Sequence, residues 1–172
     1  MVPAAVVMVP LLLMVWLFKL ILAPAIQPPG RSDALVVLGA SGEPRIQLAE
    51  RLMAEGRAKA LVVSAHPADT PGEVPRPCQA GAAYSYPVYC FDPNPSTTRG
   101  EAQAVARLAK DHGWQSVQVI TFKPQASRGR TLIGRCFDGD ISILDSGERY
   151  SVIDQLIYQS GAWVKVVAQP GC

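Results

Sequence analysis

The sequence has few charged residues and no block of either sign. Sixteen Lys and Arg stand against 14 Asp and Glu among 172 residues, giving a formal net charge of +2. No basic stripe is present to recruit nucleic acid, and no acidic tail indicates disorder. Charge therefore points to neither a nucleic-acid-binding nor a disordered protein.

The motifs of several common enzyme classes are also missing. The turn Gly39-Ala40-Ser41-Gly42 follows an apolar run and precedes a helical pattern, and backbone N–H groups at such a turn suit a phosphate. It lacks the G-x-G-x-x-G spacing of dinucleotide sites and is no Walker loop, and the chain has no G-x-S-x-G elbow. These absences disfavour nicotinamide chemistry, NTP hydrolysis and serine esterase chemistry, so we expect no cofactor.

Histidine is scarce, with only two in the chain. His66 has Asp69 and Glu73 nearby, but they fall in an irregular stretch that fixes no coordination geometry, and no second His joins them. We expect no metal site.

The cysteines are few, but their number is even, and they form no C-x-x-C or Cys/His pattern of a zinc or redox site. Three disulfide connectivities exist for four cysteines. We favour Cys78 with Cys90, which would staple a long loop, and Cys136 with Cys172, which would pin the C-terminal tail. The alternative is four free, buried thiols in a reducing compartment.

One long apolar run lies at the start, where residues 2–26 are apolar apart from Lys19. Because about 20 residues cross the hydrocarbon core of a bilayer, we predict a transmembrane anchor in residues 1–26, helical from about Ala4 to Leu22, and a linker at 27–32. A cleaved signal peptide is the alternative, but the run is long and lacks a basic n-region. Lys19 and Arg31 favour a cytoplasmic domain, whereas disulfides favour the extracytoplasmic side of the cell membrane, which we predict.

From residue 33 to 172, short apolar runs alternate with helical stripes. We predict strands at 34–38, 60–63, 86–91, 117–121 and 141–144, and helices at 44–56, 99–112, 127–137 and 151–168. Apolar runs without alternation are typical of buried parallel strands, and strict strand–helix alternation implies right-handed crossovers. The predicted fold is α/β: a three-layer, doubly wound, mostly parallel five-stranded sheet, Rossmann-like, preceded by one transmembrane helix.

Two further expectations concern the ends of this pattern. The stretch from Ser64 to Ser85 is rich in Pro, Gly and Ala and has no period, which is typical of a functional loop or a lid. In the last predicted helix we expect an inward apolar face made of Val152, Leu156, Ile157, Trp163, Val164 and Val167.

Polar residues gather where strands hand over to helices, the edge at which open α/β sheets bind ligands. Arg45 and Arg128 together would make a clamp for phosphate or carboxylate. Each candidate also has a structural interpretation: the arginines as first-turn residues, Thr98 with Glu101 as a capping box, and the others as turn residues. The ligand-binding candidates are Gly39, Ser41, Arg45, Ser64, Asp92, Ser96, Thr97, Thr98, Glu101, Gln125 and Arg128.

The order of these pieces resembles the YdcF-like, or SanA-like, envelope domain family over about residues 33–144. The resemblance rests on Val36-Val37-Leu38-Gly39 with Arg45, Val62-Val63-Ser64, Ser96-Thr97-Thr98 with Glu101, and Thr121 before Ser127-Arg128-Gly129-Arg130. It implies a bacterial envelope protein with one N-terminal transmembrane helix, a role in envelope biogenesis and barrier function, and no settled general reaction.

One residue departs from the family pattern. Members typically carry a His ahead of the Arg, where this chain has Gln125. A neutral amide can hydrogen-bond a ligand but cannot act as a general acid or base near pH 7. Catalytic residues, and catalysis itself, stay open. We expect binding of an anionic envelope metabolite or, alternatively, a non-enzymatic subunit that docks to a larger membrane complex through its N-terminal helix and has a degraded pocket.

Overall fold

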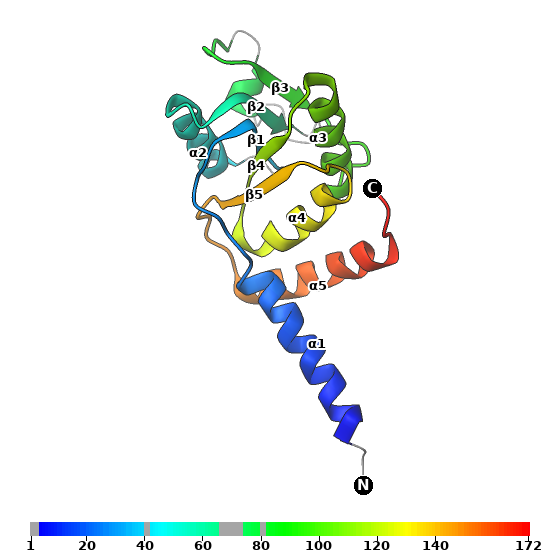
Figure 1. Ribbon diagram of the computed structural model, residues 1–172. Coiled ribbons are helices and arrows are strands. Elements are labelled where there is room, and N and C mark those ends of the chain that lie inside the picture. Colours follow the sequence, from blue (N-terminus) through cyan, green and yellow to red (C-terminus); the bar gives the residue numbers. More distant parts are fainter. Residues whose placement is uncertain (1–3, 40–41, 66–73, 80–81) are drawn as a thin grey trace.

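The computed structural model describes residues 4–39, 42–65, 74–79 and 82–172, and a single five-stranded sheet forms its centre (Figure 1). All strand pairs in the sheet are parallel, in the order β3-β2-β1-β4-β5. The predicted Rossmann-like α/β fold is thereby confirmed. The strands are β1 (Ser32–Val37), β2 (Ala58–Ser64), β3 (Val88–Phe91), β4 (Ser116–Thr121) and β5 (Asp140–Asp145).

Helices cover both faces of this sheet. On one face α2 (Glu43–Ala54) packs Ile46, Leu52 and Met53 against Leu35 and its neighbours. On the other face lie α3 (Thr98–His112) and α4 (Ala126–Gly134), which share a core with Val36, Val62 and Val119 (Figure 1). The result is the predicted three-layer arrangement.

Burial on both faces explains the sequence pattern of the central strand. Residues Ala34 to Leu38 are all fully buried, with β2 on one side of β1 and β4 on the other. A strand in that position has no solvated face, so polar residues do not alternate with apolar ones. The continuous apolar run is the direct consequence.

Both predicted disulfides form. Cys78 is joined to Cys90 with a Cα–Cα distance of 5.8 Å, and Cys136 to Cys172 with 4.9 Å. The four-free-thiol alternative is therefore wrong. Disulfides persist in oxidising compartments, and each of these closes a loop that would otherwise add to the entropy of the unfolded chain.

The long connection between β2 and β3 is tied to α2 in its described part. A short 3₁₀ turn, η1 (Arg76–Cys78), carries an arginine whose Nη2 lies 2.8 Å from a Glu50 carboxylate oxygen, and the Tyr84 hydroxyl donates to the same carboxylate at 2.8 Å. Burial, and after it the hydrogen bond to Glu50, raise the pKa of Tyr84 to about 12. This part of the connection acts as cover for the α2 face.

The N-terminal segment forms the predicted helix, α1 (Ala4–Leu22). Its last turns join the core through Ile21, which is fully buried, while the rest extends away from the domain (Figure 1). Within the described residues, we find no helix that combines the length and the apolarity needed to cross a membrane.

The inward face predicted for the last helix, α5 (Val152–Ala168), is confirmed at Trp163 and Leu156, which pack in or against the core, and is wrong at the other four positions. Val152, Ile157, Val164 and Val167 are exposed, and the buried residues are Gln159, Trp163 and Val166. The reason is that α5 packs against α4 and α1 and not against the sheet (Figure 1). Only a narrow strip of the helix is therefore covered.

Candidate functional site

A cavity of about 990 Å³ opens at the carboxyl ends of the central strands. Gly39 follows β1, Phe122 follows β4, and Glu148 follows β5, and all three line it. The chain leaves β1 toward β2 on one side while β4 pairs on the other, so this edge is the switch point at which doubly wound sheets bind ligands. Helix α5 supplies the outer wall.

Most of the sequence candidates meet in this cavity. Ser64 and Asp92 do not line it, and Ser41 lies outside the described residues. No described residue of the 64–85 stretch lines it either, so the expected functional loop or lid is not found in the described part of that connection. The candidates that line the cavity are Gly39, Arg45, Ser96, Thr97, Thr98, Glu101, Gln125 and Arg128.

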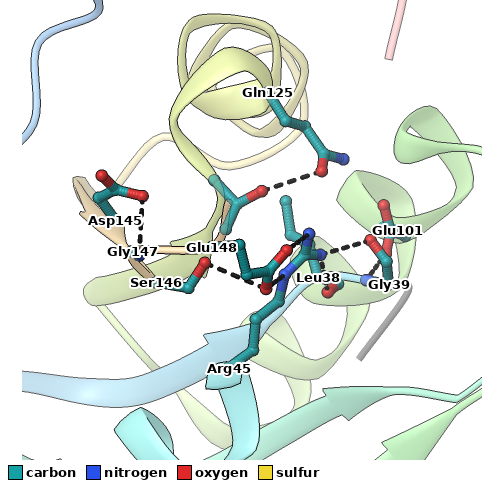
Figure 2. A network of polar contacts seen from close by, with 10 residues as sticks. Leu38, Gly39, Arg45, Glu101, Gln125, Asp145, Ser146, Gly147 and Glu148 are labelled. Atoms are coloured by element: carbon teal, nitrogen blue, oxygen red, sulfur yellow. Dashed lines mark hydrogen bonds and ion pairs between the residues drawn. The ribbon is translucent and has the colours of Figure 1, made fainter. Parts of the chain in front are cut away.

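Arg45 points into the protein and is already neutralised (Figure 2). Its Nε and Nη2 lie 2.7 and 3.0 Å from the two carboxylate oxygens of Glu148, and its Nη1 donates to the carbonyls of Leu38 and Gly39 at 2.8 Å each. Four of the five guanidinium N–H groups are thus used. The side chain is only 4% exposed, so the solvent-exposed interpretation of Arg45 is wrong. The anion-clamp role of Arg45 stays a prediction: the residue lines the cavity, but its charge is already paired with Glu148.

Arg128 is equally buried, at 8% exposed, but its partners are neutral. Its Nε donates to Gln159 Oε1 and its Nη1 to Thr98 Oγ1, each at 3.0 Å. Its charge is also attracted by the Glu101 carboxylate, which accepts a hydrogen bond from Gly39 N. Burial lowers the pKa of the Arg128 guanidinium, while the nearby Tyr158 and Glu101 oppose that shift. An arginine nevertheless stays charged in proteins, so the cavity holds a desolvated cation.

The turn before α3 fixes the acceptor for this cation. Thr97 is the N-cap of α3 and accepts a hydrogen bond from Gly100 N at 3.3 Å. The predicted capping box of Thr98 with Glu101 is therefore wrong: the cap lies one residue earlier, and Glu101 instead accepts from Gly39 N at 2.6 Å (Figure 2). Thr98 is left inside the cavity, where its Oγ1 meets Arg128.

Gly100 makes that turn sterically feasible. A Cβ at position 100 would lie 1.9 Å from the carbonyl oxygen of Pro95. A residue with a side chain cannot approach the Pro95 carbonyl so closely. The first turn of α3 can therefore pack against the preceding turn only because position 100 is glycine.

Gln125 is buried and fully engaged. Its Oε1 accepts from Thr121 Oγ1 at 2.9 Å (Figure 2), and its Nε2 donates to Thr98 Oγ1 at 3.1 Å. The amide therefore links the end of β4 to the threonine that contacts Arg128. No histidine lines the described cavity, and the described residues contain no cluster of three or more His, Cys, Asp or Glu side chains able to hold a metal.

The sequence interpretation missed the wall opposite Arg128. Tyr158, Gln159 and Lys165 of α5 and Glu148 of the loop after β5 line the cavity. Glu148 could have been found, because it follows the carboxyl end of a strand as the other candidates do. Gln159 carried no comparable signal, because Asp154, Gln155 and Ser160 near it are polar as well.

Comparison of the chain with protein-family models and with curated proteins finds no match. Membership of the YdcF-like family stays a prediction from the sequence.

Proposed function

We propose that this protein binds an anionic group, a phosphate or a carboxylate, in the cavity beside Arg128. The observation that carries the proposal is the buried guanidinium with only neutral hydrogen-bond partners. Burying an unpaired charge is costly, and an anion in the cavity would offset that cost. The cavity volume of about 990 Å³ leaves room for a group much larger than a phosphate ion.

We further propose that the domain is attached to the cell membrane through α1, as its transmembrane anchor, on the extracytoplasmic side. Support comes from the exposed apolar side chains of α1, among them Leu12, Met14 and Phe18, which are 52–67% exposed. The two disulfides fit an oxidising compartment. With the YdcF-like resemblance, these features favour a role in envelope biogenesis and an anionic envelope metabolite as ligand.

The engagement of Gln125 favours binding over proton transfer at this position. Both ends of its amide are used in hydrogen bonds within the protein, and an amide does not titrate near pH 7. This observation supports a second candidate function, a non-enzymatic accessory subunit of a larger membrane complex in which the cavity holds a ligand without converting it.

Ligand-induced stabilisation of the full chain in detergent tests the anion site. Sodium phosphate, pyrophosphate and citrate are compared with chloride at constant ionic strength, and thermal unfolding is followed. A ligand at about 100 times its Kd stabilises the folded state by about 2.7 kcal/mol. We expect stabilisation by at least one of these anions and its loss in Arg128→Gln.

Arg135→Gln is the matched control. The Arg135→Gln variant loses the same charge as Arg128→Gln does. The Arg135 guanidinium donates to the backbone carbonyl oxygens of Val166 and Gln169, and Arg135 does not line the cavity. It is expected to respond as the wild type does. If no anion stabilises the wild type, or if Arg128→Gln keeps the full response, the proposed anion site is wrong.

A further inference from the structure

Helix α5 has three different faces. Gln159, Trp163 and Val166 form the buried strip against the domain. Asp154, Tyr158 and Lys165 lie on a polar side that lines the cavity. The third side carries Ile153, Ile157, Val164 and Val167, which recur at helical spacing and therefore form one stripe, and Ile157 also lines the cavity.

This apolar stripe is open in the described structure. Ile153, Val164 and Val167 are each 69% exposed and Ile157 is 72% exposed. Isolated exposed apolar residues are ordinary, but a row of four large ones on a single helix face is a mark of an interaction surface. The stripe therefore requires a partner, and α1 indicates which one.

The apolar surface of α1 adjoins α5 and is not confined to one side. The Trp16 and Trp163 rings lie 6.1 Å apart, which places α1 beside the α5 helix. Its exposed apolar residues spread over more than half of the helix circumference: Met8, Val9, Leu11, Leu12, Met14, Val15, Trp16 and Phe18. A groove on a partner protein covers one side of a helix, whereas lipid surrounds it.

We propose that the apolar stripe of α5 lies in the interface of a lipid bilayer, next to the point where α1 enters it. Lipid is the one occupant that covers both surfaces at once. Exposed cations at this end of the molecule, Lys19, Arg149 and Lys165, outnumber the exposed Asp154 and suit anionic headgroups. An apolar stripe beside a polar face is the pattern of helices that lie in the membrane plane.

Seating α5 in this way places the cavity at the level of the headgroups. The side of α5 that lines the cavity adjoins the stripe, so the mouth beside Tyr158 and Lys165 faces the membrane surface. The anion bound at Arg128 is then the phosphate of a lipid headgroup, reached from the plane of the bilayer. This part of the inference rests on the proposed anion site, whereas the position of α5 does not.

Photo-crosslinking from neighbouring positions tests where α5 lies. A benzophenone amino acid replaces either Val164 or Lys165 in the full chain, reconstituted in phosphatidylcholine vesicles, and adducts are identified by mass. Position 164 belongs to the stripe and position 165 to the polar side, so we expect several-fold more lipid adducts from 164. Equal yields at the two positions, or adducts to a second copy of the chain, would overturn the proposal.

A second experiment separates the source of the anion. Phosphatidic acid in vesicles and water-soluble glycerol 3-phosphate are compared as stabilisers of the wild type, Val164→Glu and Arg128→Gln. We expect Val164→Glu to lose most of the stabilisation by phosphatidic acid and to keep that by glycerol 3-phosphate, while Arg128→Gln loses both. Val74→Glu is the control, since Val74 is another exposed valine, at 42%, and lies far from α5 in the chain.

The outcomes distinguish the two proposals. If Val164→Glu keeps the full response to phosphatidic acid, the lipid source is wrong and the anion site stands. If Arg128→Gln responds as the wild type does to both compounds, the anion site is wrong, and the crosslinking still decides where α5 lies.

Discussion

Two buried arginines lie at the same edge of the sheet, and their environments differ in one respect. Arg45 faces the carboxylate of Glu148 at 2.7 Å, so its charge is balanced within the protein. Arg128 donates to the side-chain oxygens of Thr98 and Gln159, and Tyr158 and the Glu101 carboxylate act on its charge from nearby. The first arginine holds the loop after β5 against β1, whereas Thr98 and Gln159, which accept from the second, are uncharged.

On the proposed function, this difference in partners decides which of the two arginines binds the anion. A bidentate pair with backbone acceptors already satisfies most of a guanidinium, so Arg45 serves to shape the cavity. A buried cation with neutral partners keeps its field directed into the cavity, where the dielectric is low and electrostatic interactions are strong. Residue type and burial are similar in both cases, and the bidentate pair with a carboxylate is what sets Arg45 apart.

Removing the counter-charge is expected to have the largest effect. Glu148→Ala leaves Arg45 buried and unpaired, and breaking a buried pair in this way costs about 3 kcal/mol of folding free energy. Urea unfolding of the full chain in detergent measures the change. Glu55→Ala is the control, because its pair with Arg57 has both partners 40% exposed or more; a loss as small as in that control would show that Arg45 does not depend on Glu148.

Displacing the acceptor of Arg128 comes next. Gly100→Ala forces the turn that ends at Thr98 to move away from a Cβ, because the space is taken by the Pro95 carbonyl. We expect a loss of about 2 kcal/mol, typical of overpacking, measured by thermal unfolding. Gly161→Ala provides the contrast: a Cβ there meets nothing within 4 Å, and alanine within a helix is favoured by about 1 kcal/mol. Equal effects in the two variants would contradict the steric argument.

The ion pair of Asp33 with Lys59 lies at the surface. It is expected to contribute less to stability than the buried pair of Arg45 with Glu148, because solvent weakens exposed ion pairs. Asp33 accepts from Lys59 at 2.7 Å, from the Gln115 backbone N–H and from the Ser116 hydroxyl, and these bonds lower its pKa from 3.8 to about 2. A lowered folded-state pKa stabilises the protein above pH 3.8, and this stabilisation is lost as the pH falls through 3.8 toward 2. Because Lys59 is 79% exposed, we expect the loss to be about 1 kcal/mol.

The measurement is the unfolding free energy of the wild type and of Asp33→Asn between pH 5 and pH 2, as an approximate range around these pKa values. The variant lacks the titrating carboxyl, so its stability is expected to fall less over that window. Parallel curves for the two proteins would show that Asp33 contributes nothing through its ionisation.

Replacing the unpaired arginine is expected to change stability least. Arg128→Met removes two hydrogen bonds and a desolvated charge together, and the two effects oppose each other, so we expect a change below about 1 kcal/mol. The same variant is expected to lose all response to phosphate. A destabilisation as large as that of Glu148→Ala would show that both arginines are structural and would remove the contrast between them.

The sequence was informative where both sides of an element are buried. Runs such as Val36 to Leu38 fit only a covered parallel strand, and parallel strands bring their carboxyl ends to one edge, which is why Arg45 and Arg128 could be predicted to lie around one cavity. The spacing of the cysteines and the positions of the loops they join were enough to favour the right pairing.

The sequence failed where the partner of an element decides its orientation. The apolar residues of α5 fit a helix that packs on the sheet, but α5 packs on other helices, and Ile157 and Val164 face outward. Likewise the sequence did not reveal Glu148 as the partner of Arg45, because the two residues lie 103 positions apart. A ligand was therefore expected to pair with the Arg45 charge. No local pattern marks a pair at that separation.

The partners of the Arg128 guanidinium lie on both sides of it in the sequence, Thr98 30 residues before it and Gln159 31 residues after it. Thr98 and Gln125 precede Gln159 in the chain, and the Nε hydrogen of Arg128 has its acceptor only once α5 has docked. On the proposed function, docking of α5 therefore completes the anion site, and a chain truncated before α5 would lack this acceptor and one wall of the cavity.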